Sequence, residues 1–194
     1  RIIDEQLGQT WGEGDKRLQP MTRQEIDALR KWTPEQMAQR VVRYADLQWS
    51  GDALLDSCLP GCGGAMAPVI GLGMSQDRNH LAPVYNAHGF SIEWLHLPAG
   101  GSMSRHNLED KQVLVVYEGQ LAVDIEGCDA PTTIAAHGSA EGWDSYAMPA
   151  NTWRSYRNTG NAPAVVLVMT AGDHRKDLLW DDAVVQAAGA LDRA

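Results

Sequence analysis

The chain has 194 residues, 44% of them hydrophobic, which is enough to bury the core of one domain with an added arm. Its formal net charge of −9 argues against nucleic acid or an anionic membrane surface as the main partner. No apolar run reaches the roughly 18 residues that a membrane-spanning helix needs. The cysteines number three, and an odd number suits a reducing cytoplasm better than a disulfide framework. We therefore expect a cytoplasmic globular protein.

The N-terminal part is predicted to be an arm over 1–66, with two short helices and a Gly/Pro-rich loop. Thr22–Glu25 fits a capping box, in which a hydroxyl and a carboxylate each satisfy a free backbone N–H group. Thr33–Gln36 repeats the pattern with proline at the first helical position. We expect helices over about 22–32 and 34–46.

From Gly89 onward, short apolar runs alternate with turns. The runs are "FSIEWLHL", "QVLVVYE", "QLAVDIEG", "TTIAA", "DSYAMP", "TWRSYRN" and "AVVLVMT". Short strands at a spacing of about 8–12 residues predict a β-sandwich or barrel. The tail "DLLWDDAVVQAAGALDRA" has a helical pattern. The prediction is a mainly β protein, with a barrel over 67–180 and a C-terminal helix over 181–194.

The turns "PAGG" and "YEG" and the hairpin "PANTWRSYRN" stand at the spacing of two cupin motifs, so residues 67–180 resemble the cupin family. The resemblance implies a jelly-roll β-barrel, with a metal held by two His and a Glu from the first motif and a His from the second. The stretches "LLDSCLPG" and "GDHRKDLLWDDAVVQAA" are similar to quercetinase-like or ring-cleaving dioxygenase-like cupins. Several of those have two barrels in one chain, and helices at 22–46 would fit a connector that follows a first barrel.

The resemblance also shows where the ligand set departs from the family. His106 stands at the first ligand position, but Leu108 replaces the second His, Gln112 the Glu, and Arg154 the last His. A guanidinium is never neutral in proteins, and two like unit charges about 4 Å apart cost about 4 kcal/mol at an effective dielectric near 20. We therefore expect a degenerate metal site without a metal or other cofactor.

An inward Arg154 would instead favour an anion, which it can hold by two parallel hydrogen bonds. Strand alternation places Arg154 and Tyr156 on the same face. The predicted ligand is a small molecule that carries a carboxylate or a phosphate, bound by Gln112, Arg154 and Tyr156 beside Leu108. His106 and Arg154 are the candidate catalytic residues.

Other functions stay open. The domain could be a structural or dimerising unit, partnered with an active cupin barrel. A divergent ring-cleaving dioxygenase would bind iron or another divalent transition metal through His106, Gln112 and His96. A metal-free isomerase or lyase would use His106 as a general base and Arg154 to hold a carboxylate.

The chain is also expected to form a homodimer. Trp11, Trp32 and Trp49 lie in a segment with little core of its own. Covering such side chains takes a partner surface or the outside of the barrel.

Overall fold

The structure is a computed structural model, and it describes residues 2–4, 9–11, 18–20, 22–24, 32–84, 88–138 and 141–191. The chain divides into two units, Arg1–Val41 and Val42–Ala194, which we describe separately. In the first unit, three short strands form an antiparallel sheet in the order β1-β2-β3. They are β1 (Ile2–Asp4), β2 (Gln9–Trp11) and β3 (Leu18–Pro20).

Helix α2 (Pro34–Ala38) begins as the capping box predicts. The Gln36 N–H donates to the Thr33 hydroxyl over 3.2 Å, and the Thr33 N–H donates to the Gln36 side chain over 3.0 Å. The predicted extension to residue 46 is wrong, because α2 ends at Ala38 and a separate 3₁₀ turn, η1, follows at Tyr44–Asp46. Helix α2 buries no residue, so it lacks the packing that stabilises long helices in proteins. The helix expected at 22–32 lies mostly outside the described residues, as does the side chain of Trp11.

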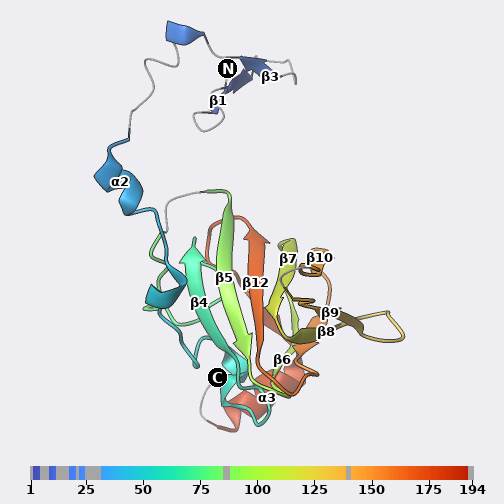
Figure 1. Ribbon diagram of the computed structural model, residues 1–194. Coiled ribbons are helices and arrows are strands. Elements are labelled where there is room, and N and C mark those ends of the chain that lie inside the picture. Colours follow the sequence, from blue (N-terminus) through green and yellow to red (C-terminus); the bar gives the residue numbers. More distant parts are fainter. Residues whose placement is uncertain are drawn as a thin grey trace. The chain divides into compact units, whose positions relative to one another are not determined.

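The second unit contains two antiparallel sheets of five strands each among the described residues (Figure 1). The first sheet has the order β10-β7-β12-β5-β4, and the second sheet has the order β13-β6-β11-β8-β9. The first consists of β4 (Ala65–Ile70), β5 (Phe90–Leu97), β7 (Gln112–Glu118), β10 (Ser145–Met148) and β12 (Ala164–Ala171). The second consists of β6 (Ser102–Asn107), β8 (Gln120–Ile125), β9 (Thr132–Ala135), β11 (Arg154–Arg157) and β13 (Leu179–Trp180).

Successive strands from β5 to β8 alternate between the two sheets, and the core lies between them. Apolar side chains from both sheets fill this interior, among them Leu95, Leu114, Leu121 and Val166, all fully buried. The predicted mainly β, jelly-roll fold is confirmed.

Two local features keep the turns in place. Gly119 links β7 to β8 with φ +73°, and a Cβ there would lie 2.6 Å from the carbonyl oxygen of Pro163. Only glycine fits such a position, which explains the "YEG" turn. Asn151 precedes β11 with φ +54°, a conformation that asparagine tolerates better than most residues.

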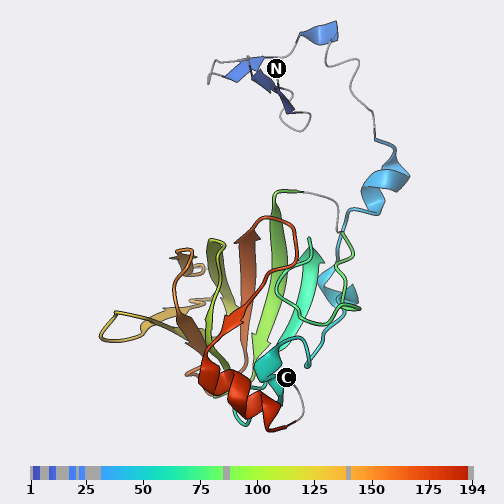
Figure 2. The ribbon, with the colours of Figure 1, turned by 180° about the vertical axis from the view of Figure 1, so that it is seen from behind.

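Helix α3 (Asp182–Gly189) follows β13 and contacts the short 3₁₀ helix η2 (Leu55–Cys58) (Figure 2). Its N-cap is Asp181, whose carboxylate accepts from the Ala183 N–H over 3.0 Å. Among the helices that the structure describes, none has the length and apolar character that a membrane span requires.

Strand β4 is one of the two edges of the first sheet, and that edge is covered. Ser50 and Met66 exchange two backbone hydrogen bonds of 2.9 and 3.0 Å, and the Gly71 N–H donates to the Val84 carbonyl. Pro68 lies between these contacts on the same strand and has no N–H group to offer.

Candidate functional site

Three adjacent strands of the second sheet bring a cation, an imidazole and an indole together in the interior. On β6, His106 stands opposite Arg154 of β11 on one side and opposite Trp180 of β13 on the other. All three side chains are buried, with exposures of 0%, 1% and 5% for His106, Arg154 and Trp180. Directly opposed residues in antiparallel strands have Cβ atoms about 4.5–5.5 Å apart. The ring centroids of His106 and Trp180 are 5.6 Å apart.

The Arg154 guanidinium has neutral acceptors. Its Nη1 donates to the Thr152 carbonyl over 3.0 Å, and its Nη2 donates to Gln112 Oε1 over 2.9 Å. Its Nε–H has no hydrogen-bond partner within the described part of the chain. No ion pair joins this guanidinium to a carboxylate of a described residue. Among the described residues, Arg154 is therefore a buried positive charge without a counter-charge.

Gln112 connects Arg154 to the first sheet. Its Oε1 also accepts from the Tyr156 hydroxyl over 3.3 Å, and its Nε2 donates to Thr170 Oγ1 over 3.0 Å and to Met74 Sδ over 3.1 Å. The predicted ligand-binding residues Gln112, Arg154 and Tyr156 thus form one network.

His106 is neutral and its orientation is set. Its Nδ1 donates to the Ser104 carbonyl over 2.7 Å, so Nε2 carries the lone pair. Burial lowers the pKa of His106 to about 4, and the nearby Arg154 charge acts in the same direction. Nε2 is buried and accepts no hydrogen bond from any described group. The Trp180 Nε1–H is likewise buried and unpartnered among them.

The side chains at the cupin ligand positions do not fit a catalytic metal, which needs about three protein ligands and an open position. His106 offers one nitrogen, and the oxygen of Gln112 is already engaged by Arg154 and Tyr156. Leu108 is a core side chain with no donor atom. Within the described ranges, no group of three or more His, Cys, Asp or Glu side chains could hold a metal ion.

His96 does not join His106. In β5, the buried positions alternate with partly exposed ones, and His96 is in the second set. Its ring lies 6.2 Å from that of Trp49, on the outer face of the first sheet. The structure thus separates two of the three ligands that a dioxygenase would require.

A pocket of about 370 Å³ lies at the end of the interior where β6 stops. Leu108 belongs both to its wall and to the hydrophobic core. It follows two residues after His106, the middle member of the buried row formed by Arg154, His106 and Trp180. The other lining residues are mostly polar: Asn107, Glu109, Asp110, Asn151, His174, Asp177, Leu178 and Leu179. Lys176 lies 3.4 Å from Asp110, whereas Glu109 and Asp177 leave the pocket acidic.

Sequence reasoning missed two residues of this interior, Trp180 and Glu93. Glu93 is fully buried, and both of its carboxylate oxygens accept from the Met74 N–H, over 2.9 and 2.8 Å. Burial raises the pKa of Glu93 to about 7, although these hydrogen bonds oppose the shift. A signal existed for Glu93, because it is in phase with Leu95 and Leu97, the buried positions of "FSIEWLHL".

The fold and this buried row define a jelly-roll domain with a few polar side chains buried in its apolar interior. Residues 93–170 match the family model described as "Cupin domain", so the chain contains a cupin domain. No curated protein sequence matches the chain.

Solved structures with the same fold include DMSP lyases. DddQ from Ruegeria pomeroyi is 18% identical with a TM-score of 0.50, and the match covers 70% of this chain and 61% of that one. A structure among the DMSP lyases RdDddP and RnDddQII is 11% identical with a TM-score of 0.53, covering 70% and 63%. This chain therefore matches less than two thirds of either lyase chain. A cupin sugar phosphate isomerase from Silicibacter pomeroyi is 17% identical with a TM-score of 0.47, covering 73% and 82%.

Proposed function

We propose that this cupin domain binds a small carboxylate-bearing molecule without a metal, with Arg154 as the anchor. The observation that carries the proposal is the buried guanidinium, 1% exposed, whose acceptors are neutral. Charged side chains are almost never fully buried unless they are paired. Desolvating such an ion costs several kcal/mol, which a bound anion offsets.

The buried row contains three polar atoms without hydrogen-bond partners among the described residues, and these indicate which ligand groups would fit. The Nε–H of Arg154 and the Nε1–H of Trp180 are donors, and they suit the oxygens of a carboxylate. The Nε2 of His106 is an acceptor, and it suits a hydroxyl group. A small hydroxycarboxylate would satisfy all three atoms.

The pocket next to Leu108 favours a carboxylate over a phosphate. Glu109 and Asp177 line it, and a phosphate near neutral pH carries more negative charge than a carboxylate. Like charges at the approach to the site disfavour the doubly charged ligand more strongly.

A metal-free isomerase or lyase is the second candidate, because His106 keeps a free lone pair beside Arg154. A general base works best when its pKa lies near the working pH. The pKa of His106, about 4, makes it a weak base, so we place binding ahead of catalysis.

We also propose a cytoplasmic location. Cys58, Cys62 and Cys128 are all free thiols. Cys62 lies beside Ser104, with 3.2 Å between Sγ and Oγ, and Cys58 donates to the Leu55 carbonyl. Free thiols are typical of reducing compartments.

Calorimetric titration with acetate, glycolate and phosphate tests the proposed function. We expect glycolate to bind most tightly, because its hydroxyl can reach His106. The variant Arg154→Met should weaken glycolate binding by about 10- to 100-fold, since a charge-assisted hydrogen bond contributes about 1.5–3 kcal/mol. Arg157→Met is the matched control, because Arg157 lies on the same strand but is exposed.

Equal binding by the wild type and Arg154→Met would contradict the proposal, as would no binding of any of the three anions. Metal analysis of the same samples tests the dioxygenase alternative. A stoichiometric transition metal that is lost on His106→Ala would favour that alternative.

A further inference from the structure

The outer face of the first sheet, which points away from the core, carries largely apolar side chains. The partly exposed positions of β5, β12 and β7 alternate with the buried ones and point away from the core. They are Phe90, Ile92, Trp94, His96, Val113, Val115, Tyr117, Leu167, Met169 and Ala171. None is Asp, Glu, Lys or Arg. Antiparallel sheets usually keep one face polar, so this face, which we call the outer sheet face, is suited to being covered.

One half of the outer sheet face is an aromatic ridge, formed by Tyr44, Trp49, Trp94, Tyr117 and Trp143. The rings of Trp94 and Tyr117 are 5.5 Å apart, although their strands are separated by β12, so they meet above β12. Tyr117 stacks on Trp143 at 5.8 Å, and Tyr44 meets Trp94 at 5.3 Å. Trp143 is 56% exposed. Aromatic side chains are enriched in the centres of protein interfaces.

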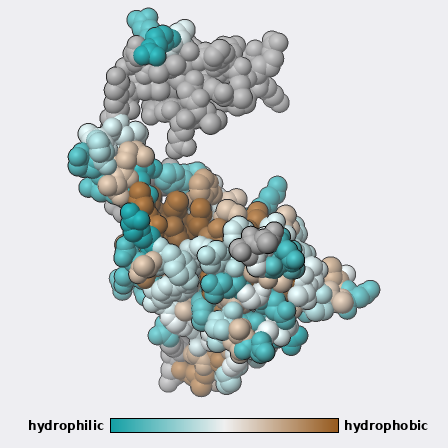
Figure 3. All heavy atoms as spheres, viewed as in Figure 1, coloured by the Kyte–Doolittle hydropathy of each residue, from teal (hydrophilic) through white to brown (hydrophobic). Residues whose placement is uncertain are grey.

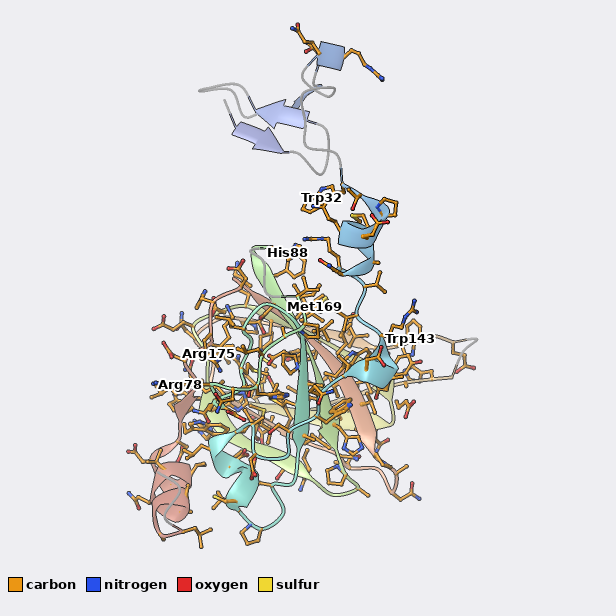
Figure 4. All side chains as sticks on the ribbon, turned by 90° about the vertical axis from the view of Figure 1, so that its left-hand side faces the viewer. Trp32, Arg78, His88, Trp143, Met169 and Arg175 are labelled. Atoms are coloured by element: carbon orange, nitrogen blue, oxygen red, sulfur yellow. The ribbon has the colours of Figure 1, made fainter. Side chains whose placement is uncertain are left out.

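The other half is an aliphatic hollow of about 400 Å³, lined chiefly by Phe90, Ile92, Val113 and Met169. Figure 3 shows the corresponding hydrophobic patch over β5 and β12. In Figure 4, Trp143 lies on the side of the molecule away from Arg78 and Arg175, and Met169 lies nearer the end marked by His88.

Strand register fixes the order of the two halves. Met169 stands opposite Ile92 and Val113, and the next outward residue of β12, Leu167, stands opposite Trp94. The hollow and the ridge therefore follow each other along the strands. A two-fold axis that lies in the plane of this face and runs across the strands would place each ridge on the hollow of a second copy.

The charges at the two ends support the same pairing. Lys111 lines the hollow. Glu118 lies near the ridge, where its charge contributes to the raised pKa of Tyr44. The two-fold arrangement brings the Lys111 end of one copy to the Glu118 end of the other, so opposite charges meet at the rim.

The outer sheet face supplies part of the area that a dimer needs. Its residues lie on three strands, β5, β12 and β7. At about 4.8 Å per strand and about seven residues of about 3.3 Å, this gives roughly 330 Å². The side chains of Tyr44, Trp49 and Trp143 lie outside the strands and add to it. A standard interface buries about 800 Å² on each partner.

We propose that the outer sheet face is the interface of a symmetric homodimer, in which the aromatic ridge of each copy fills the aliphatic hollow of the other. This interface involves none of the residues of the buried row. It also differs from the expected role of Trp11 and Trp32, because only Trp49 of the three tryptophans belongs to the ridge.

Sedimentation velocity of the full chain tests the interface. At about 20 µM the wild type should sediment at about twice the 21.2 kDa chain mass, and Met169→Lys should sediment as a monomer, because a lysine in the hollow buries an unpaired charge. Val185→Lys is the matched control, since it places the same charge on the exposed side of α3 and should remain dimeric. Circular dichroism shows whether each variant is folded.

A mixing experiment tests the pairing of ridge and hollow. Trp143→Glu alone should also be monomeric, because its charge would enter the partner's hollow. Mixed with Met169→Lys, it should form a heterodimer, in which one contact is a Lys–Glu pair and the other is unchanged. A monomeric wild type, a dimeric Met169→Lys, or a mixture without heterodimer would each overturn the proposal. A wild-type monomer would assign the face to another part of this chain or to a different apolar protein.

Discussion

Two buried residues on opposite sheets, Glu93 and His106, respond to pH in opposite senses. Burial raises the pKa of Glu93 from 4.5 to about 7, so the folded protein holds a proton that the unfolded chain releases. Stability from this group is complete below pH 4.5 and falls as the pH rises towards 7. Burial lowers the pKa of His106 from 6.5 to about 4, so its contribution is complete above pH 6.5 and is lost as the pH falls towards 4. Each shift corresponds to roughly 3 kcal/mol.

In the wild type, the two opposite dependences of the unfolding free energy on pH nearly cancel. Single substitutions should therefore reveal each of them. We expect Glu93→Gln to gain roughly 3 kcal/mol of unfolding free energy relative to the wild type between pH 4.5 and pH 7. His106→Gln should gain a similar amount relative to the wild type as the pH falls from 6.5 to 4. Urea denaturation at pH 4.5, 5.5 and 7 measures both differences. Differences that do not change with pH would show that the pKa of neither residue shifts on folding.

At the scale of residues, the sequence predicted some of the buried polar side chains of the interior and missed others. His106, Gln112 and Arg154 were predicted because the cupin motifs mark their positions, and Tyr156 because strand alternation places it on the same face as Arg154. The structure brings the four side chains together. Trp180 was missed because its proximity to His106 depends on the pairing of β13 with β6. No local pattern encodes a contact between segments so far apart in the chain.

At the scale of elements, the pairing of β6 with β11 suggests how a metal site could be built. His106 and Arg154 are direct partners across these strands, and Leu108 follows two residues after His106 and is buried. Histidine at both positions would surround one point with three imidazoles, a set that zinc and nickel accept.

We expect the double variant Leu108→His/Arg154→His to bind zinc at about one ion per chain, and the wild type to bind much less. Arg154→His alone supplies only two imidazoles and should bind weakly, which makes it the matched control. Equilibrium dialysis with elemental analysis gives the stoichiometry. Equal zinc content in the double variant and the wild type would show that these side chains do not converge.

Element types were predictable where the period of the sequence was clear. The seven predicted strand runs after Gly89 became β5 and β7 to β12, because alternation and turn residues such as Gly119 agree there. Strand β6, which carries His106, was not among the predicted runs. The helix expected to reach residue 46 failed, because its apolar positions find no core and no residue of α2 is buried. Capping residues mark where a helix begins, whereas its length depends on packing.

At the scale of the whole molecule, association should contribute to stability. If the folded dimer unfolds to separate chains, its melting temperature depends on protein concentration by mass action. A tenfold increase should raise the melting temperature by about 2 °C for chains of this size. Differential scanning calorimetry at two concentrations measures the shift. Met169→Lys should melt at the same temperature at both, and a concentration-independent wild type would contradict the dimer.

The covered edge of β4 limits how the first sheet can be extended by another chain. An open strand edge repeats itself with each added chain, so it can grow into a fibril without limit. Pro68 lacks the N–H that such growth needs, and Ser50 and Val84 occupy the backbone groups on either side. A sheet face that pairs with a second copy, in contrast, cannot bind a third copy, so association stops at the dimer. Pro68→Val would restore one donor at this edge, and only loss of the Ser50 and Val84 contacts as well would open it to a strand from another chain.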